Sequence, residues 1–347
     1  MKRIIILIIA VCFVGGGFSA FADEYEKVSE ESFSVSKNAS LTIQNRYGDI
    51  LLNTWDKDEV KITVTVICET ARKDKADRFF EKVDIEMQGN KDAVRAETHL
   101  RFNNSKVKSF AINYTIYAPA SLTFYLNNRF GDVFLPDLGG ALILDLQYGE
   151  FSIGRLLNDK NQLDIAFSEG EIAYFEAGLI DIEYSELEIE SAKIITVDSD
   201  FSDISIEKAA LMNVETGYDE IEIGEVDELI IESDFSEIDI TVLNNRLNGN
   251  LNYGELDLER TRSSVSDIYL TGKFTEIYCG LTAGITWKFL ANAEFTDIDF
   301  SHDVNYIGKS DENTFKKIYS GLLWDKKDPS AVFTLEAKNC DVKIEKL

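Results

Sequence analysis

Hydrophobic and polar residues alternate with a period of two along most of this chain, and one short phrase interrupts the alternation at regular intervals. The phrase is an aromatic residue, a small residue, an acid and an aliphatic residue, as in Phe201-Ser202-Asp203-Ile204. From Phe130 to Phe295 the aromatic residues follow one another at steps of 18, 19, 17, 17, 17, 17, 18, 21 and 21 residues. A period this regular predicts a repeat architecture in which each unit buries its apolar face against the next.

Both flanks of the aromatic residue have the pattern of strands. Val197 and Ser199 precede Phe201 at even spacing, and Ile204 and Ile206 follow it; such alternation is typical of strands. Because the phase slips by one residue in between, we expect a corner at the small residue after the aromatic, with the aromatic side chain facing inward. Each unit is then a strand, a corner, a second short strand and a turn.

Stacked in register, such units predict an all-β fold, a parallel β-helix or β-solenoid with repeats of about 17–21 residues. The alternative is an antiparallel β-sandwich made of many short strands. In the solenoid, the aromatic residues form one structural column of buried rings: Tyr47, Phe130, Tyr148, Phe167, Tyr184, Phe201, Tyr218, Phe235, Tyr253, Phe274 and Phe295.

An acid follows each corner, so stacking would place these acids in a ladder with a spacing of about 4.8 Å. Its members are Asp49, Asp132, Glu150, Glu169, Glu186, Asp203, Glu220, Glu237, Glu255, Glu276, Asp297 and Asp341. Neighbouring charges at that spacing repel by about 0.9 kcal/mol in water, before screening by salt. Calcium binding or capping of the backbone by the side chains could offset the repulsion. We favour a solvated, screened face with no specific metal, because the calcium-binding solenoid repeat is absent.

The first 22 residues have the pattern of a secretory signal. Lys2 and Arg3 form a basic start, an apolar run follows from Ile4 to Val14, and Ala20-Phe21-Ala22 resembles a cleavage site. This pattern predicts an exported protein in the periplasm, at the cell surface or outside the cell. Nothing later in the sequence approaches 18 consecutive apolar residues, so we expect no transmembrane segment in the mature chain.

The rest of the chain divides into three regions. Residues 23–118 predict a first repeat and an N-terminal cap, with one helix near 71–83 whose apolar residues share one face. Residues 119–304 contain the regular repeats. Residues 305–347 predict a C-terminal cap and a last repeat, in which Asn339 takes the place of the aromatic residue. Capping repeats are expected because a bare sheet edge promotes aggregation.

Composition argues against several classes of function. The net charge of −27 and the absence of a basic patch make nucleic acid an improbable partner. His99 and His302 lack partners at metal-binding spacing, no cofactor or catalytic motif occurs, and we expect no cofactor and no enzyme activity. The three cysteines outside the signal predict small buried apolar residues: Cys68, Cys279 and Cys340. The alternative is a polysaccharide-active β-helix enzyme that uses paired carboxylates.

Two repeats and the step between them carry a family resemblance. The phrase around Tyr47-Gly48-Asp49 recurs around Phe130-Gly131-Asp132, and Tyr117-Ala118-Pro119-Ala120-Ser121 leads into the second copy. With the signal and the repeating strands, the chain resembles the bacterial putative-adhesin family of β-strand-repeat proteins over roughly residues 30 to 347. The resemblance implies an envelope-associated β-solenoid without established catalytic residues. It implies an adhesin, or a surface binding or structural module, whose partner is an envelope, glycan or protein ligand that the sequence does not identify.

Overall fold

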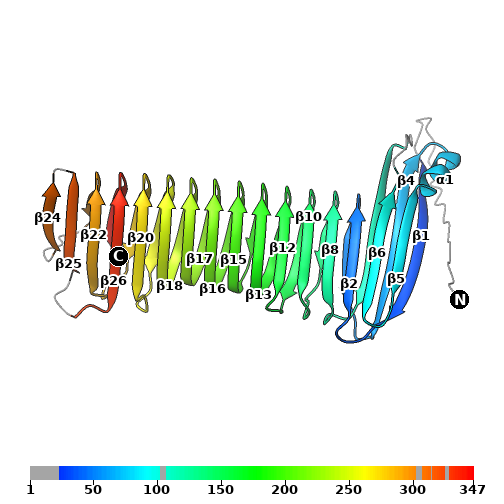
Figure 1. Cartoon of the computed structure of the whole chain (residues 1–347), viewed down its shortest axis with the longest axis horizontal. Helices are drawn as coiled ribbons and strands as arrows, with labels where there is room; N and C mark the ends of the chain where they lie inside the picture. The colour runs from blue at the N-terminus through cyan, green and yellow to red at the C-terminus, as the bar shows by residue number, and fades with distance from the viewer. Residues whose placement is uncertain (1–22, 102–106, 302–306, 314, 325–327) are drawn as a thin grey trace, which may run out of the picture. The chain divides into compact units, whose positions relative to one another are not determined.

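The computed structural model describes residues 23–347 except 102–106, 302–306, 314 and 325–327. The described chain is all-β with a single helix, α1 (Lys73–Phe80), which lies within the range predicted from the sequence (Figure 1). The predicted signal, residues 1–22, lies outside the described residues. No helix in the described part of the chain is long and apolar enough to cross a membrane.

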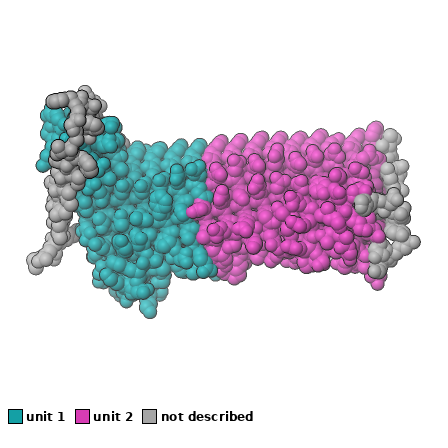
Figure 2. Space-filling model, turned by 180° about the vertical axis from the view of Figure 1, so that it is seen from behind, with its two compact units in different colours: residues 1–170 teal, residues 171–347 magenta. Residues whose placement is uncertain are grey.

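The chain forms two compact units, residues 1–170 and residues 171–347 (Figure 2). The boundary falls inside the stretch of regular repeats. Each unit therefore contains repeats together with a segment of a different kind, and the two units are described separately.

Unit 1 begins with an antiparallel sheet. Strand β4 (Glu59–Thr70) pairs antiparallel with β1 (Asp23–Ser34) and with β7 (Ser109–Ala118). The helix α1 buries Ala76 and Phe79, and the Phe79 ring packs 5.0 Å from that of Phe110 on β7. A second antiparallel pair joins β5 (Val83–Gly89) to β6 (Ala93–Leu100).

The repeats of unit 1 are joined by parallel pairs. Strand β2 (Ser40–Arg46) lies between β6 and β8 (Thr123–Arg129), parallel to both. The strands before the corners continue in parallel through β10 (Leu142–Gln147) and β12 (Asn161–Ala166). The strands after the corners, β3 (Ile50–Thr54), β9 (Val133–Leu135) and β11 (Glu150–Leu156), are also parallel. The repeats at Tyr47 and Phe130 are thus neighbours in space, and the helix-bearing segment is an excursion between them.

Unit 2 continues with repeats paired residue for residue. Ile204, Ile221 and Ile238 lie side by side on three neighbouring strands, each parallel to the next. The strands from β13 to β21 are β13 (Glu169–Glu183, whose residues 171–183 belong to unit 2), β14 (Glu186–Ile189), β15 (Ala192–Asp200), β16 (Asp203–Gly217), β17 (Glu220–Asp234), β18 (Glu237–Asn252), β19 (Glu255–Thr261), β20 (Asp267–Lys273) and β21 (Glu276–Leu281). We call one repeat, with the strand residues before its corner and those after it, a rung.

The rung formed by residues 331–346 is last in the chain but lies inside the stack. Its strands β26 (Ala331–Lys338) and β27 (Asp341–Lys346) are parallel to β20 and β21 on one side. On the other side they are parallel to β22 (Trp287–Glu294) and β23 (Asp297–Phe300). Figure 1 shows β26, in red, between β20 and β22. Residues 331–346 are thus the last rung in the sequence, but in space they lie between two other rungs.

The segment before that rung covers an edge of unit 2. Strand β25 (Lys316–Leu323) pairs antiparallel with β22 and with β24 (Ile307–Asn313). A strand thus covers the edge of β22 that does not face β26, and the assignment of a C-terminal cap within residues 305–347 stays a prediction.

The core consists of the inward residues of every strand. On β16 every second residue is buried near the two corners. Ile204 and Ile206 after the first corner, and Met212 and Val214 before the next, are each at most 5 % exposed. Cys68, Cys279 and Cys340 are free thiols buried among these side chains, as predicted. The period-two pattern of the sequence thus gives the inward and outward faces of the strands correctly.

Candidate functional site

The residue at the aromatic position forms the corner of each rung. We number each repeat from this residue, position 0, whose φ lies between 50° and 66° in all eleven aromatic positions. This left-handed conformation costs a non-glycine residue roughly 1–2 kcal/mol. Asp200 and Phe201, at positions −1 and 0, both face solvent, whereas Ser202, at position +1, is buried. The phase slip therefore lies before the aromatic residue and not after it.

The aromatic rings consequently point outward, and the expectation of a buried column was wrong. Ten of the eleven are between 41 % and 55 % exposed, and Tyr47 is half-buried beside Phe110, with 5.4 Å between the ring centroids. The sequence pattern alone placed these rings inward because large apolar residues usually are. At these corners the left-handed backbone turns the side chain outward instead.

The exposed rings stack face to face within each unit. In unit 1 the centroids of Tyr47, Phe130, Tyr148 and Phe167 follow one another at 5.2, 5.0 and 4.9 Å. In unit 2 the stack comprises Tyr184, Phe201, Tyr218, Phe235, Tyr253 and Phe274, with centroids 4.9–5.0 Å apart and ring planes within 7°. Each contact contributes about 0.5–1.5 kcal/mol beyond the area it buries. Because each contact is shared by two rings, the six rings of unit 2 have five contacts, and this stacking offsets part of the cost of the left-handed backbone.

Asn339 interrupts the row of rings in unit 2. Its φ is 53°, so it takes the corner conformation between Phe274 and Phe295 without supplying a ring. Phe274 donates its main-chain N–H to Lys338 O, and Asn339 donates to Glu294 O, both at 3.0 Å. Phe295 packs instead against Phe315, with a centroid distance of 4.9 Å.

Position +1 lies inside the rung and carries small or polar residues for two physical reasons. At Gly131 a Cβ atom would lie 2.2 Å from Gly48 O of the neighbouring rung, so the backbones are too close for a side chain. Where the residue is Ser, the hydroxyl joins the rungs. Ser202 Oγ accepts the N–H of Ser185 at 3.2 Å and donates to Asp200 O at 3.1 Å. Buried polar groups are thereby satisfied along the interior of the corner.

Asp219 is a buried acid in this interior row. It is 5 % exposed, and its Oδ1 accepts the N–H of Ser202 at 2.6 Å. Its Oδ2 accepts from the Thr216 hydroxyl and from the Gly217 N–H, the latter at 3.0 Å. Burial raises the pKa of this carboxyl, and the hydrogen bonds only partly oppose the rise.

The structure places the acids at position +2 on the outer face, next to the rings. In unit 2 their rungs pair in the order Glu186, Asp203, Glu220, Glu237, Glu255, Glu276, Asp341 and Asp297. Asp341 therefore stands between Glu276 and Asp297, because its rung is inserted there. Lys317 pairs with Asp297 at the end of this row.

In unit 1 two of the acids cap the neighbouring backbone. Asp49 Oδ1 accepts the N–H of Asp132 at 3.0 Å, and Asp132 Oδ1 accepts the N–H of Glu150 at 2.8 Å. Glu169 donates its own N–H to Gly149 O at 3.3 Å. The short arm of Asp suits a bond to the next rung, so at these positions the backbone-capping interpretation describes the carboxylates.

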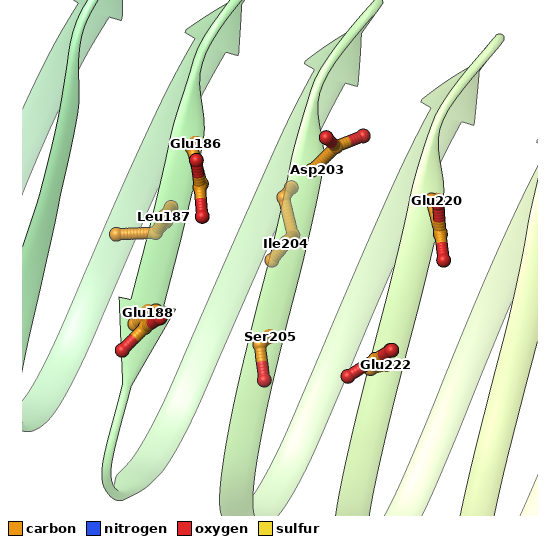
Figure 3. A pocket seen from close by; sticks show the side chains of 8 residues that line it. All are labelled: Glu186, Leu187, Glu188, Asp203, Ile204, Ser205, Glu220 and Glu222. Atoms are coloured by element: carbon orange, nitrogen blue, oxygen red, sulfur yellow. The ribbon is translucent and has the colours of Figure 1, made fainter.

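A second acidic row, at position +4, runs beside the first in unit 2. Glu188, Glu222, Asp239 and Asp257 lie two residues after their position +2 acids and on the same face of the sheet. This row was not predicted from the sequence, although the alternation of strand residues places +2 and +4 on one face. Between the rows lies an open pocket of about 240 Å³, in which Glu186, Glu188, Asp203, Glu220 and Glu222 point outward (Figure 3).

Two carboxyl groups of these rows, those of Glu255 and Asp257, have raised pKa values. Partial burial raises the pKa of Glu255, and the charges of Glu276 and Glu237 raise it further. Burial likewise raises the pKa of Asp257, with Asp239 adding to the effect. In both carboxyl groups burial is the larger cause, and the neighbouring negative charges add to it.

No group of three or more His, Cys, Asp or Glu side chains within the described residues is arranged to hold a metal ion. His99 is partly exposed, with Nε2 3.8 Å from Glu86 Oε2 and Nδ1 3.8 Å from Glu97 Oε1. His302 lies outside the described residues. The outer corner of unit 2, consisting of the stacked rings and the acidic rows at +2 and +4, is therefore the candidate site, and we call it the acidic–aromatic ridge.

No family model and no curated protein matches the chain. Several solved structures are similar to it. One is described as a putative adhesin from Parabacteroides distasonis, with 12 % identity, coverage of 72 % of this chain and 96 % of the other, and a TM-score of 0.33. A second is a putative cell adhesion protein from Clostridium sporogenes, with 11 % identity, coverage of 92 % and 100 %, and a TM-score of 0.18. A third is a putative lipid binding protein from Parabacteroides distasonis, with 12 % identity, coverage of 92 % and 96 %, and a TM-score of 0.28.

Proposed function

We propose that this chain is an exported, non-catalytic β-solenoid that serves the cell envelope as a surface binding or structural module. The signal-like pattern of residues 1–22 supports export to the periplasm, the cell surface or the outside of the cell. The in-register parallel pairs at the repeat period support the solenoid. In this proposal residues 23–118 supply a first rung and a cap, and residues 305–347 supply a cap and the inserted rung.

The acidic–aromatic ridge is the observation that supports binding. A row of half-exposed rings runs between carboxylates at positions −1 and +2, such as Asp200 and Asp203 beside Phe201. Position +2 is an acid on every neighbouring rung, and position −1 is an acid beside Tyr184, Phe201 and Phe235, so the ridge suits an extended partner better than a small molecule. Exposed apolar rows of this kind are typical of interaction surfaces.

The geometry of the rings favours a positively charged partner over a neutral glycan. Sugars bind aromatic side chains through the ring faces, and in the stack from Tyr184 to Phe274 each interior ring has neighbours against both faces. What remains exposed is a row of ring edges beside the continuous row of carboxylates at position +2. Long basic side chains lay their apolar stems along such a surface and hold their charges near the acids. We therefore propose a basic protein or another extended polycation as the partner.

The test is binding of the purified chain to poly-L-lysine, with dextran as a neutral glycan. We expect salt-sensitive binding to poly-L-lysine that weakens severalfold in E220Q/E237Q, on the ridge. The matched control is E215Q/E232Q, which removes two exposed charges from neighbouring rungs at position −3. Equal loss in both variants would show general charge attraction and contradict a site on the ridge. Turnover of a polysaccharide by the chain would contradict the non-catalytic function.

A further inference from the structure

The rung of residues 331–346 has an unusual place in unit 2. Strands such as β16 lie beside the strands that precede and follow them in the sequence, here β15 and β17. In contrast, β26 lies between β20 and β22, and β27 between β21 and β23 (Figure 1). Neither of the flanking rungs is connected directly to it, because β24 and β25 come between β23 and β26 in the chain.

The rung is held by the backbone at both of its edges. On the β20 side, Phe274 donates to Lys338 O at 3.0 Å and Asp341 donates to Thr275 O at 3.2 Å. On the β22 side, Asn339 donates to Glu294 O, and Cys340 donates to Thr296 Oγ1, both at 3.0 Å. Lys338 also forms an ion pair of 2.9 Å with Glu294. The position between the two flanking rungs thus offers hydrogen-bond partners to both edges of one inserted rung.

The side chains match this position in shape. Phe333 is fully buried, and its ring lies edge-on to Phe289 of β22 at 5.4 Å. On β20, a Cβ atom added to Gly272 would lie 3.1 Å from Cys340 Sγ, so the glycine leaves room for the inserted rung. Val342 and Ile344 complete the inward face and are fully buried. Residues 331–346 are therefore a specific occupant and not a loose cover.

We propose that the position between β20–β21 and β22–β23 is an exchange site, which the same rung of a second copy of this chain can fill. A rung supplied by the second copy makes the same hydrogen bonds and buries the same side chains, so the exchange loses no contact. The two forms differ in which copy supplies the rung and in the entropy of association. Exchange of an identical element is a low-cost route to dimers. An empty position would expose two sheet edges, which favours its being filled by any available copy.

Engineered disulfides distinguish the two forms. Thr271 of β20 and Glu336 of β26 are register partners on the outer face, and so are Asn250 and Thr271 on the consecutive strands β18 and β20. Neighbouring strands lie about 4.8 Å apart, which permits a disulfide. The variant T271C/E336C reports on the exchange site. The variant N250C/T271C is the matched control, because both its strands belong to one chain in either form.

The chain is unfolded under reducing conditions, refolded at increasing concentration, oxidised and separated by gel filtration. We expect a dimer whose ratio to monomer rises about tenfold for a tenfold rise in monomer concentration, in wild type as in both variants. On a non-reducing gel, the dimer of T271C/E336C should run as a covalent dimer, and its monomer as a single chain. The dimer of N250C/T271C should separate into single chains. Refolding to monomer alone at every concentration, or a dimer of T271C/E336C that separates into single chains, would overturn the proposal.

Discussion

The main-chain N–H of Ser202 donates a 2.6 Å hydrogen bond to Oδ1 of Asp219, which occupies the same position on the next rung. In the neighbouring rungs the equivalent bond ends on a serine hydroxyl: Ser185 donates to Ser202 Oγ at 3.2 Å, and Asp219 donates to Ser236 Oγ at 3.0 Å. A carboxylate thus replaces a hydroxyl within a buried row. This substitution leads to the first prediction.

Asp219 should make the stability of unit 2 decrease with rising pH. Burial raises its pKa in the folded chain, so the folded state binds more protons than the unfolded state above the ordinary Asp pKa of about 3.9. Its contribution is most favourable below that pH and is lost as the pH rises through the folded pKa. In D219S we expect the free energy of unfolding to fall less steeply, by up to about 1.4 kcal/mol per pH unit in that window. Chemical denaturation from pH 4 to pH 7 measures this, and parallel curves for both chains would contradict it.

The stacked rings should stabilise the corners by less than buried rings would. Phe235 is 47 % exposed and stacks on Tyr218 and Tyr253 at 4.9 Å each. F235A should therefore lower the free energy of unfolding by about 1–3 kcal/mol, from the loss of two ring contacts. F235N should cost less, because Asn tolerates the left-handed backbone better, as Asn339 illustrates. Urea unfolding measures both variants, and a more stable F235A than F235N would contradict this account of the corner.

The acidic rows should repel one another measurably at neutral pH. The pKa of Glu255 is raised by burial and by Glu276 and Glu237, so E255Q should raise the melting temperature at low salt. The corresponding gain in the free energy of unfolding should stay below about 1 kcal/mol and decrease as salt is added. The matched control is E176Q, since Glu176 pairs with Lys193, which lowers the pKa of Glu176. A gain of equal size in E176Q would show that total charge matters and not the row.

Calcium should stabilise the chain little more than sodium does at matched ionic strength. The rows present carboxylates at one per rung, and no group of three or more ligands is arranged around a point in the described part of the chain. Screening of the rows is then the dominant effect of any cation. Thermal unfolding in millimolar calcium, with and without chelator, measures this. A large, saturable rise that the chelator reverses would contradict it.

The sequence predicts some features of the corner and fails on others for a definite reason. The alternation around Ile204 and Ile206 identifies the inward residues, because burial on a strand follows a period of two. It fails at Phe201, since the pattern does not reveal that the backbone turns left-handed there. The sequence pattern does not distinguish two consecutive outward residues, here Asp200 and Phe201, from a bulge placed after the aromatic residue.

The order in which the rungs lie side by side could not be predicted from the sequence either. The repeat phrase at Asn339 indicates that residues 331–346 form a rung, but periodicity carries no information about which neighbours a rung selects. The close approach of the Cys340 side chain to Gly272, for example, joins residues that are 68 positions apart in the sequence (340 − 272). The acidic row at position +4 could have been predicted from the sequence, since positions +2 and +4 share one face of the strand after each corner.

The central claim is that consecutive rungs stack in parallel at one spacing, and distances between spin labels test it most directly. Asp181, Asp198, Glu215, Glu232, Asn250 and Thr271 are register partners from rung to rung in unit 2. Labels on cysteines introduced pairwise at 181 and 232, at 181 and 250, and at 181 and 271 span three, four and five steps. The stack predicts backbone separations of about 14, 19 and 24 Å, rising by about 4.8 Å per step. Distances that do not increase from one pair to the next, as in an antiparallel sandwich, would contradict it.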